Sequence, residues 1–180
     1  HRVPHLVTAH GADVFWLERL ARLPGARSAL ASLWSRSALV APAERTARRV
    51  GVALGRSDVE VAPLPASVAA SEPRSLPPRL LYLGRFEPIK GPDLLLEAIA
   101  RLPPGMFQDL TIAGAGILEP ALRQRAARLG VPARFPGVLD GPGKAEALAA
   151  SHAVVLPSRR LRDGRTEGLP HAAIESLAAG

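Results

Sequence analysis

Hydrophobic positions are most regular in the second half of the chain, where short apolar runs alternate with stretches of helical periodicity. The apolar runs predict strands at residues 79–86, 110–113, 133–139 and 152–157. Apolar residues three or four positions apart predict helices at 92–102, 118–129, 144–150 and 170–179. Strands that alternate with helices through short connections form parallel sheets covered on both faces. We therefore expect residues 79–180 to be a doubly wound α/β lobe, truncated at its C-terminal end.

The first half carries a weaker version of the same pattern. Strand-like runs occupy residues 4–8, 37–41 and 59–62, and helical stretches occupy 14–23, 26–34 and 43–54. About 65 residues are too few for an independent α/β domain, so we expect residues 1–66 to be an incomplete lobe; the family resemblance described below implies that it is Rossmann-like. The proline-rich stretch 67–78 predicts a linker between the two lobes. Since neither lobe reads as complete, we expect the chain to be a segment of a longer protein.

Composition narrows the class of protein. Apolar residues make up 47% and charged residues 22% of the chain, as in ordinary globular domains. The absence of cysteine excludes disulfides and thiolate metal sites and fits a reducing cytoplasm. No apolar run approaches the length of a transmembrane helix.

The net charge of +7 suits an anionic partner such as a nucleotide diphosphate or an anionic lipid surface. The alternative is a compositional preference for arginine that has no functional meaning. Aromatic residues make up only 4% of the chain, and no recognition motif is present, so we expect no nucleic-acid partner.

Basic residues and glycines follow the predicted strands of the second half. In open parallel sheets, ligands bind beyond the carboxyl ends of the strands. After the first strand come Gly84, Arg85 and Lys90, whose two cations could hold a diphosphate, although two solvated loop residues would look the same. After the second strand, Gly114 lets the backbone approach a ligand or simply forms a tight turn.

The most informative group of residues surrounds the start of the last helix. Residues 167–170 read Glu-Gly-Leu-Pro, and Glu175 follows Glu167 by eight positions. A helix N-terminus favours phosphate, and carboxylates beside it are suited to accept hydrogen bonds from sugar hydroxyls. The alternative is a carboxylate that complements the helix dipole together with a solvated helical Glu175.

Together, these motifs resemble glycosyltransferase family 4, whose members have the GT-B fold. The resemblance runs from Arg79 to the end of the chain and includes Arg134–Val138 and the E-x7-E pair Glu167 and Glu175. Upstream, residues 8–13 are similar to an acceptor-lobe segment that ends in a histidine facing the donor. The resemblance implies two Rossmann-like lobes with a nucleotide-diphosphate sugar between them as donor substrate.

The resemblance also implies a role for each candidate residue. Arg85 and Lys90 would hold the diphosphate, Glu167 the transferred sugar and Glu175 the ribose hydroxyls. The implied catalytic residues are His10, Arg85, Lys90 and Glu167. The implied donor-binding residues are Gly84, Arg85, Lys90, Gly114, Val138, Glu167, Gly168, Leu169, Pro170 and Glu175. Family members need no bound metal or other cofactor, and the chain has no Asp-x-Asp sequence to hold one.

The implied activity is retaining transfer from a UDP- or GDP-sugar to a glycan or lipid-linked acceptor, in bacterial cell-surface polysaccharide biosynthesis. It implies a cytoplasmic protein and leaves peripheral contact with the inner membrane surface open. Alternatives are a GT-B-like sugar-nucleotide epimerase and a non-catalytic nucleotide-binding α/β module. His171 departs from the small apolar residue that family members often carry there. We expect this chain alone to be inactive.

Overall fold

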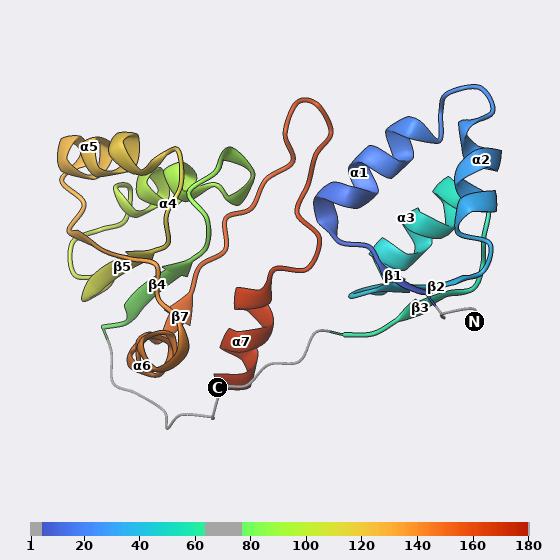
Figure 1. The fold of residues 1–180 in the computed structure, drawn as a ribbon. Helices are drawn as coiled ribbons and strands as arrows, with labels where there is room; N and C mark the ends of the chain where they lie inside the picture. The colour runs from blue at the N-terminus through green and yellow to red at the C-terminus, as the bar shows by residue number, and fades with distance from the viewer. Residues whose placement is uncertain (1–4, 64–76, 180) are drawn as a thin grey trace. The chain divides into compact units, whose positions relative to one another are not determined.

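The computed structural model describes residues 5–63 and 77–179. Residues 67–76 of the predicted linker, Pro4 of the first predicted strand and Gly180 lie outside the described residues. The chain divides into two compact units (Figure 1). The first unit is His1–Pro65 with Asp163–Leu169, and the second is Ala66–Arg162 with Pro170–Gly180. Asp163–Leu169 thus belongs to the first unit, although the sequence analysis assigned it to the lobe 79–180.

The first unit is a three-stranded parallel sheet with helices on one side (Figure 1). Its elements are β1 (His5–Thr8), α1 (Gly11–Leu20), α2 (Ala26–Leu33), β2 (Ser37–Ala41), α3 (Glu44–Leu54) and β3 (Val59–Val61). The strand order is β1-β2-β3, so both crossovers run in the same direction. Right-handed crossovers in one direction place the connecting helices on the same face. The core of this unit contains Val14 and Leu17 of α1, Leu39 of β2 and Val50 of α3.

The second unit is a four-stranded parallel sheet covered on both faces. The strands are β4 (Arg79–Leu83), β5 (Asp109–Ala113), β6 (Ala133–Gly137) and β7 (Ala153–Val154), in the order β6-β5-β4-β7. The connecting elements are the 3-10 helix η1 (Pro88–Lys90), α4 (Pro92–Ile99), α5 (Glu119–Leu129), α6 (Gly141–Ala150) and α7 (His171–Ala179). Figure 1 shows α4 and α5 on one face of the sheet and α6 and α7 on the other. The predicted parallel α/β fold is confirmed.

Alternation along the central strand β4 supplies both cores of this unit. Tyr82 packs with α4 and α5, in a cluster that also contains Leu96 and Leu122. Its neighbours Leu81 and Leu83 point to the opposite face and pack with α6 and α7. Successive side chains of a strand point to opposite faces, so an uninterrupted apolar strand is buried on both sides. This explains why residues 79–83 carry no polar position after Arg79.

Several predicted bounds differ from the observed ones, and three of the differences have a clear physical reason. The helix predicted at 14–23 begins at Gly11, and the helix predicted at 144–150 begins at Gly141. In each case a polar residue, His10 or Asp140, stands at the N-cap, and the first turn has too few apolar side chains to register as periodic. The strand predicted at 152–157 is reduced to β7 because only Leu80 and Leu81 of β4 pair with it.

Candidate functional site

The strand order of the second unit reverses direction at β4, and this reversal creates a place where a ligand could bind. From β4 through β5 to β6 the chain moves one way across the sheet, and then it returns past β4 to β7. The loops that leave β4 and β7 therefore run to opposite faces of the sheet. Such a switch point opens a crevice beyond the carboxyl ends of the strands, where open α/β sheets bind ligands.

A cavity of about 430 Å³ lies at this edge of the second unit. The loop after β4, the loop after β5, the segment from β6 into α6, and the start of α7 all line it. The lining residues used below are Gly84, Arg85, Lys90, Gly114, Val138, Lys144, Pro170, His171 and Glu175. The cavity is large enough for a small organic ligand.

Two loops pack backbone against backbone at the floor of this cavity. The amide of Gly84 donates to the carbonyl of Ala113 (3.1 Å), and the amide of Phe86 donates to the carbonyl of Ala115 (2.8 Å). Gly114 has a φ of +146°, and a Cβ there would overlap the carbonyl oxygen of Gly84. Gly114 is therefore required for loop packing, which supports the tight-turn alternative raised from the sequence.

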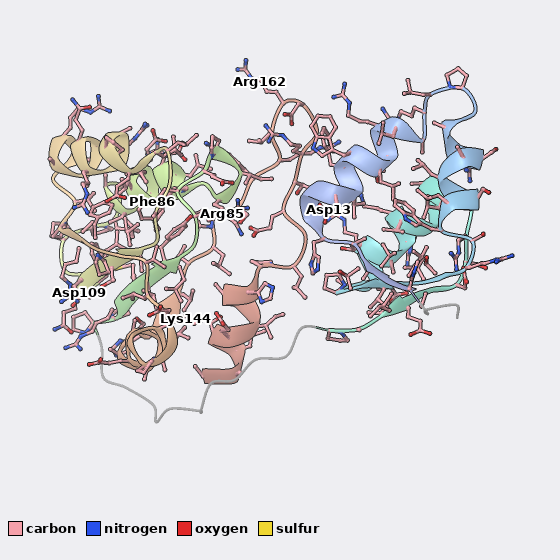
Figure 2. All side chains as sticks on the ribbon, in the orientation of Figure 1. Asp13, Arg85, Phe86, Asp109, Lys144 and Arg162 are labelled. Atoms are coloured by element: carbon pink, nitrogen blue, oxygen red, sulfur yellow. The ribbon has the colours of Figure 1, made fainter. Side chains whose placement is uncertain are left out.

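The first loop presents two cations to the cavity. Arg85 is 71% exposed, and its Nη1 lies 2.8 Å from Glu87 Oε1 (Figure 2 shows Arg85 beyond β4). Burial lowers the pKa of Lys90, and the positive charge of Arg85 lowers it further, against an opposing effect of Glu87. The buried hydroxyl of Tyr82 donates to the carbonyl of Arg85 (2.9 Å) and thereby stabilises the loop after β4. Because the charge of Arg85 disfavours the charged form of Lys90, an anionic ligand beside them would relieve their mutual repulsion.

A second wall of the cavity, lined by α6 and α7, contains an ion pair. Lys144 Nζ donates to Glu175 Oε1 at 2.6 Å, and the two side chains are 32% and 18% exposed. Figure 2 places Lys144 on α6. Pro170 and His171 also line the cavity, so it includes the N-terminus of α7. This wall offers a partial positive charge from the helix, an ammonium and a carboxylate within one cavity.

The structure thus gathers most of the predicted donor-binding residues. Gly84, Arg85, Lys90, Gly114, Val138, Pro170 and Glu175 all line the one cavity. The remaining candidates, His10, Glu167, Gly168 and Leu169, belong to the first unit. In that unit His10 caps α1, and its amide donates to Asp13 Oδ2 (3.2 Å). Their assigned roles stay predictions.

Sequence reasoning missed Lys144. It stands shortly after a predicted strand and is basic, which is the reasoning that selected Arg85 and Lys90. Lys144 belongs to a helix in the prediction and in the structure, so a rule that considers only the loops after strands does not reach it. The observed helix begins at Gly141 and carries the ammonium to the cavity.

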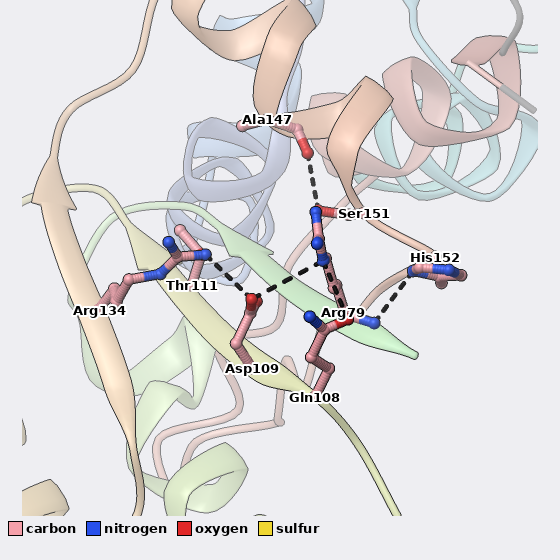
Figure 3. A network of polar contacts seen from close by, with 8 residues as sticks. All are labelled: Arg79, Gln108, Asp109, Thr111, Arg134, Ala147, Ser151 and His152. Atoms are coloured by element: carbon pink, nitrogen blue, oxygen red, sulfur yellow. Dashed lines mark hydrogen bonds and ion pairs between the residues drawn. The ribbon is translucent and has the colours of Figure 1, made fainter. Parts of the chain in front are cut away.

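A separate polar network lies at the other ends of the strands (Figure 3). Arg134 Nη2 lies 3.2 Å from Asp109 Oδ2, and Arg79 Nε lies 3.9 Å from the same oxygen. A second cavity of about 350 Å³ borders these residues, and Glu146 also lines it. Here two guanidinium groups are balanced by two carboxylates, and none of the predicted site residues lines this cavity.

The topology and the strand-end cavity define a Rossmann-like α/β lobe. Residues 77–180 match the family described as glycosyl transferases group 1. The chain belongs to this family, as the resemblance to glycosyltransferase family 4 predicted.

Individual relatives agree with this assignment. The D-inositol 3-phosphate glycosyltransferase 2 of Catenulispora acidiphila is 35% identical over 127 residues, covering 62% of this chain and 28% of the relative. The phosphatidyl-myo-inositol mannosyltransferase of Mycobacterium tuberculosis is 36% identical over 104 residues, covering 56% and 26%. This chain thus spans about a quarter of the length of these relatives.

A solved structure extends the likeness of fold to both units. Anabaena Alr3699/HepE, crystallised in complex with UDP-glucose, matches 97% of this chain and 51% of its own with a TM-score of 0.69 at 17% identity. The fold is therefore that of GT-B glycosyltransferases. Among the described residues, none of the helices has the length and apolar character needed to span a bilayer.

Proposed function

We propose that this chain carries the donor site of a retaining glycosyltransferase that uses a UDP- or GDP-sugar. The observation that carries the proposal is the single cavity shared by Arg85, Lys90 and the start of α7. Two cations and a helix N-terminus form an anion site with the charge that a pyrophosphate requires. Membership of the family and the UDP-glucose complex of Anabaena Alr3699/HepE support this choice of ligand.

Each part of the cavity has a proposed role towards the donor. Arg85 offers a planar fork and Lys90 a mobile point charge to the diphosphate oxygens. The backbone near Val138 faces the base, while Glu175 accepts hydrogen bonds from the ribose hydroxyls. Lys144 holds the carboxylate of Glu175 in place for that contact. As the sugar leaves, the same cations stabilise the charge that accumulates on the departing diphosphate.

The residues of the first unit complete the proposal. In this proposal, Glu167 holds the transferred sugar, and the backbone of Gly168 and Leu169 faces the sugar and the phosphate. His10 lies near the reacting carbon of the sugar. The proposed acceptor is a glycan or a lipid-linked acceptor, in cell-surface polysaccharide biosynthesis. The two curated relatives, named as a glycosyltransferase and a mannosyltransferase, support transfer as the reaction.

Calorimetric titration of the chain with UDP, GDP and their nucleosides tests the diphosphate site. Each charge-assisted hydrogen bond contributes roughly 1.5–3 kcal/mol, so Lys90→Ala should weaken diphosphate binding about tenfold to hundredfold. Nucleoside binding should stay unchanged. The matched control is Arg134→Ala, which removes a cation from the far ends of the strands. Equal losses for Lys90→Ala and Arg134→Ala would reject the site.

The carboxylates are tested by changing the ligand together with the protein. Glu175→Ala should weaken UDP but not 2′,3′-dideoxy-UDP, because only the former offers ribose hydroxyls. In the natural protein, Glu167→Ala should weaken the sugar nucleotide more than the free diphosphate. Equal loss for both ligands would reject the role of the substituted residue. A natural protein that binds nucleotide sugars without releasing or transferring the sugar would favour the non-catalytic alternative.

A further inference from the structure

Arg159 lies just beyond β7 and does not line the cavity, yet it makes an unusually complete set of contacts. Its Nε donates to the carbonyl of Pro88 (2.7 Å), and its Nη1 and Nη2 contact the carboxylate of Asp93 (3.0 and 3.1 Å). Its own amide donates to the carbonyl of Ile89 (2.9 Å). All of these partners lie between Pro88 and Asp93, in η1 and the first turn of α4.

This segment is the one that carries Lys90. The 3-10 helix η1 is only three residues long, and the amide of Lys90 closes it by donating to the carbonyl of Glu87 (3.0 Å). So short a helix has too few internal hydrogen bonds to set its own shape. Gly91 follows at a φ of +64°, and a Cβ there would overlap the carbonyl oxygen of Pro157. The turn is thus shaped by the segment after β7.

The contact requires an arginine in particular. One guanidinium donates to a carbonyl through Nε and to a carboxylate through both terminal nitrogens, a fork that lysine lacks. The Arg159 side chain is 31% exposed, whereas Arg85 in the same unit is 71% exposed. The two arginines therefore differ in use: Arg85 points to the cavity, and Arg159 is occupied by the protein.

We propose that Arg159 is a positioning residue that holds the turn Pro88–Lys90, and through it the Lys90 ammonium, at the diphosphate site. The inference rests on the proposed function, since it assumes that Lys90 binds a diphosphate. Arg159 acts through backbone and carboxylate contacts and does not touch the ligand. It makes the segment after β7 part of the anion site.

A double-mutant cycle on UDP binding tests this assignment. Arg159→Gln should weaken UDP about fivefold to twentyfold in the natural chain but less than twofold when Lys90 is already alanine, because the two residues act through one contact. Uridine binding should not change. The UDP affinity of Arg159→Lys should lie between those of the natural chain and Arg159→Gln. Asp93→Asn should weaken UDP binding by part of the loss seen in Arg159→Gln. The exposed neighbour Arg160→Gln is the matched control and should bind UDP normally.

Each result of the cycle has a separate meaning. UDP binding by Arg159→Gln at the natural level overturns the inference while leaving the proposed function intact. An equal loss in both backgrounds also overturns it, because Arg159 would then act on the fold in general. If the natural chain binds no nucleoside diphosphate, or Lys90→Ala has no effect, the proposed function fails and this inference fails with it.

Hydrogen exchange provides a readout without nucleotide. Arg159→Gln should speed exchange of the Lys90 amide at least fivefold while leaving exchange of the amide of Ile112, a buried residue of β5, unchanged. Unchanged exchange at Lys90 overturns the positioning role, and faster exchange at Ile112 as well would indicate a general loss of stability and overturn it too. Asp93→Asn repeats the measurement if Arg159→Gln fails to fold.

Discussion

The two sheets of this protein share parallel strands and right-handed crossovers but differ in how they are covered. In the first unit all crossovers run in one direction, and Leu6 of β1 remains 65% exposed. In the second unit the direction reverses at β4, and Leu81 and Tyr82 on its two faces are 0% and 1% exposed. One reversal of direction thus changes both the burial of the sheet and its capacity to form a strand-end crevice.

The same contrast applies to the polar side chains. In the first unit, Arg49 makes a two-point ion pair with Glu18 (2.7 Å for each bond) that joins α3 to α1. In the second, the pair of Lys144 and Glu175 joins two helices but also lines the cavity. Similar ion pairs therefore serve packing in one unit and, by our proposal, ligand binding in the other.

The largest expected effect comes from the difference in burial. Leu81→Ala should destabilise the second unit by about 2–5 kcal/mol, because it leaves a cavity at a fully buried position between β4 and the helices α6 and α7. Leu6→Ala should change stability by no more than about 0.5 kcal/mol. Urea unfolding, followed by hydrogen exchange in each unit separately, measures both. Similar losses would show that Leu6 is buried in solution and would remove the contrast.

A smaller effect concerns the pH dependence of diphosphate binding at the cavity. Burial and Arg85 lower the pKa of Lys90, so its ammonium loses its proton at a lower pH than an ordinary lysine. Diphosphate affinity should fall as the pH rises through this lowered pKa, by at most about tenfold per pH unit. Titrations of UDP between about pH 7 and pH 10 measure the slope. Lys90→Arg should abolish the alkaline decline, and an identical slope in this variant would exclude Lys90 as its source.

The smallest effects separate the two ion pairs. Arg49→Ala should cost about 0.2–1 kcal/mol of stability, as partly exposed pairs do, without changing nucleotide affinity. Lys144→Ala should have a similarly small effect on stability but weaken UDP severalfold, since Glu175 loses its partner. Thermal unfolding and UDP titration of both variants check this. Unchanged UDP affinity in Lys144→Ala would make that pair structural as well.

The stability of the fold at acidic pH tests the ion pair of the first unit further. The hydrogen bond from Arg49 lowers the pKa of Glu18. This interaction stabilises the fold above the ordinary glutamate pKa, and the stabilisation is lost as the pH falls through the lowered pKa. Arg49→Ala should therefore remove part of the acid dependence of unfolding, measured between about pH 2 and pH 5. An unchanged acid profile would show that the pair is not formed in solution.

Much of the fold could be read from the chain because its determinants are local. Short apolar runs and helical spacing predicted the strands and helices of both units, with errors in several bounds, among them those of β7 and the starts of α1 and α6. Parallel strands bring their carboxyl ends to one edge, so Arg85, Lys90 and Glu175 could be assigned to a common site from sequence order alone. The missed residue Lys144 lies in the first turn of α6, so a rule for the loops that follow strands does not reach it.

The sequence by itself determined the parallel α/β architecture and which residues stand at the strand ends, because each depends on neighbours within a few positions. Only the tertiary structure decided which side chains pair in the wall of the cavity and which segment Arg159 contacts. Lys144 and Glu175 are 31 positions apart, and Arg159 lies 71 and 66 positions from Pro88 and Asp93. Such contacts depend on where the packed helices and loops end to within an ångström or so, and no local periodicity encodes that distance.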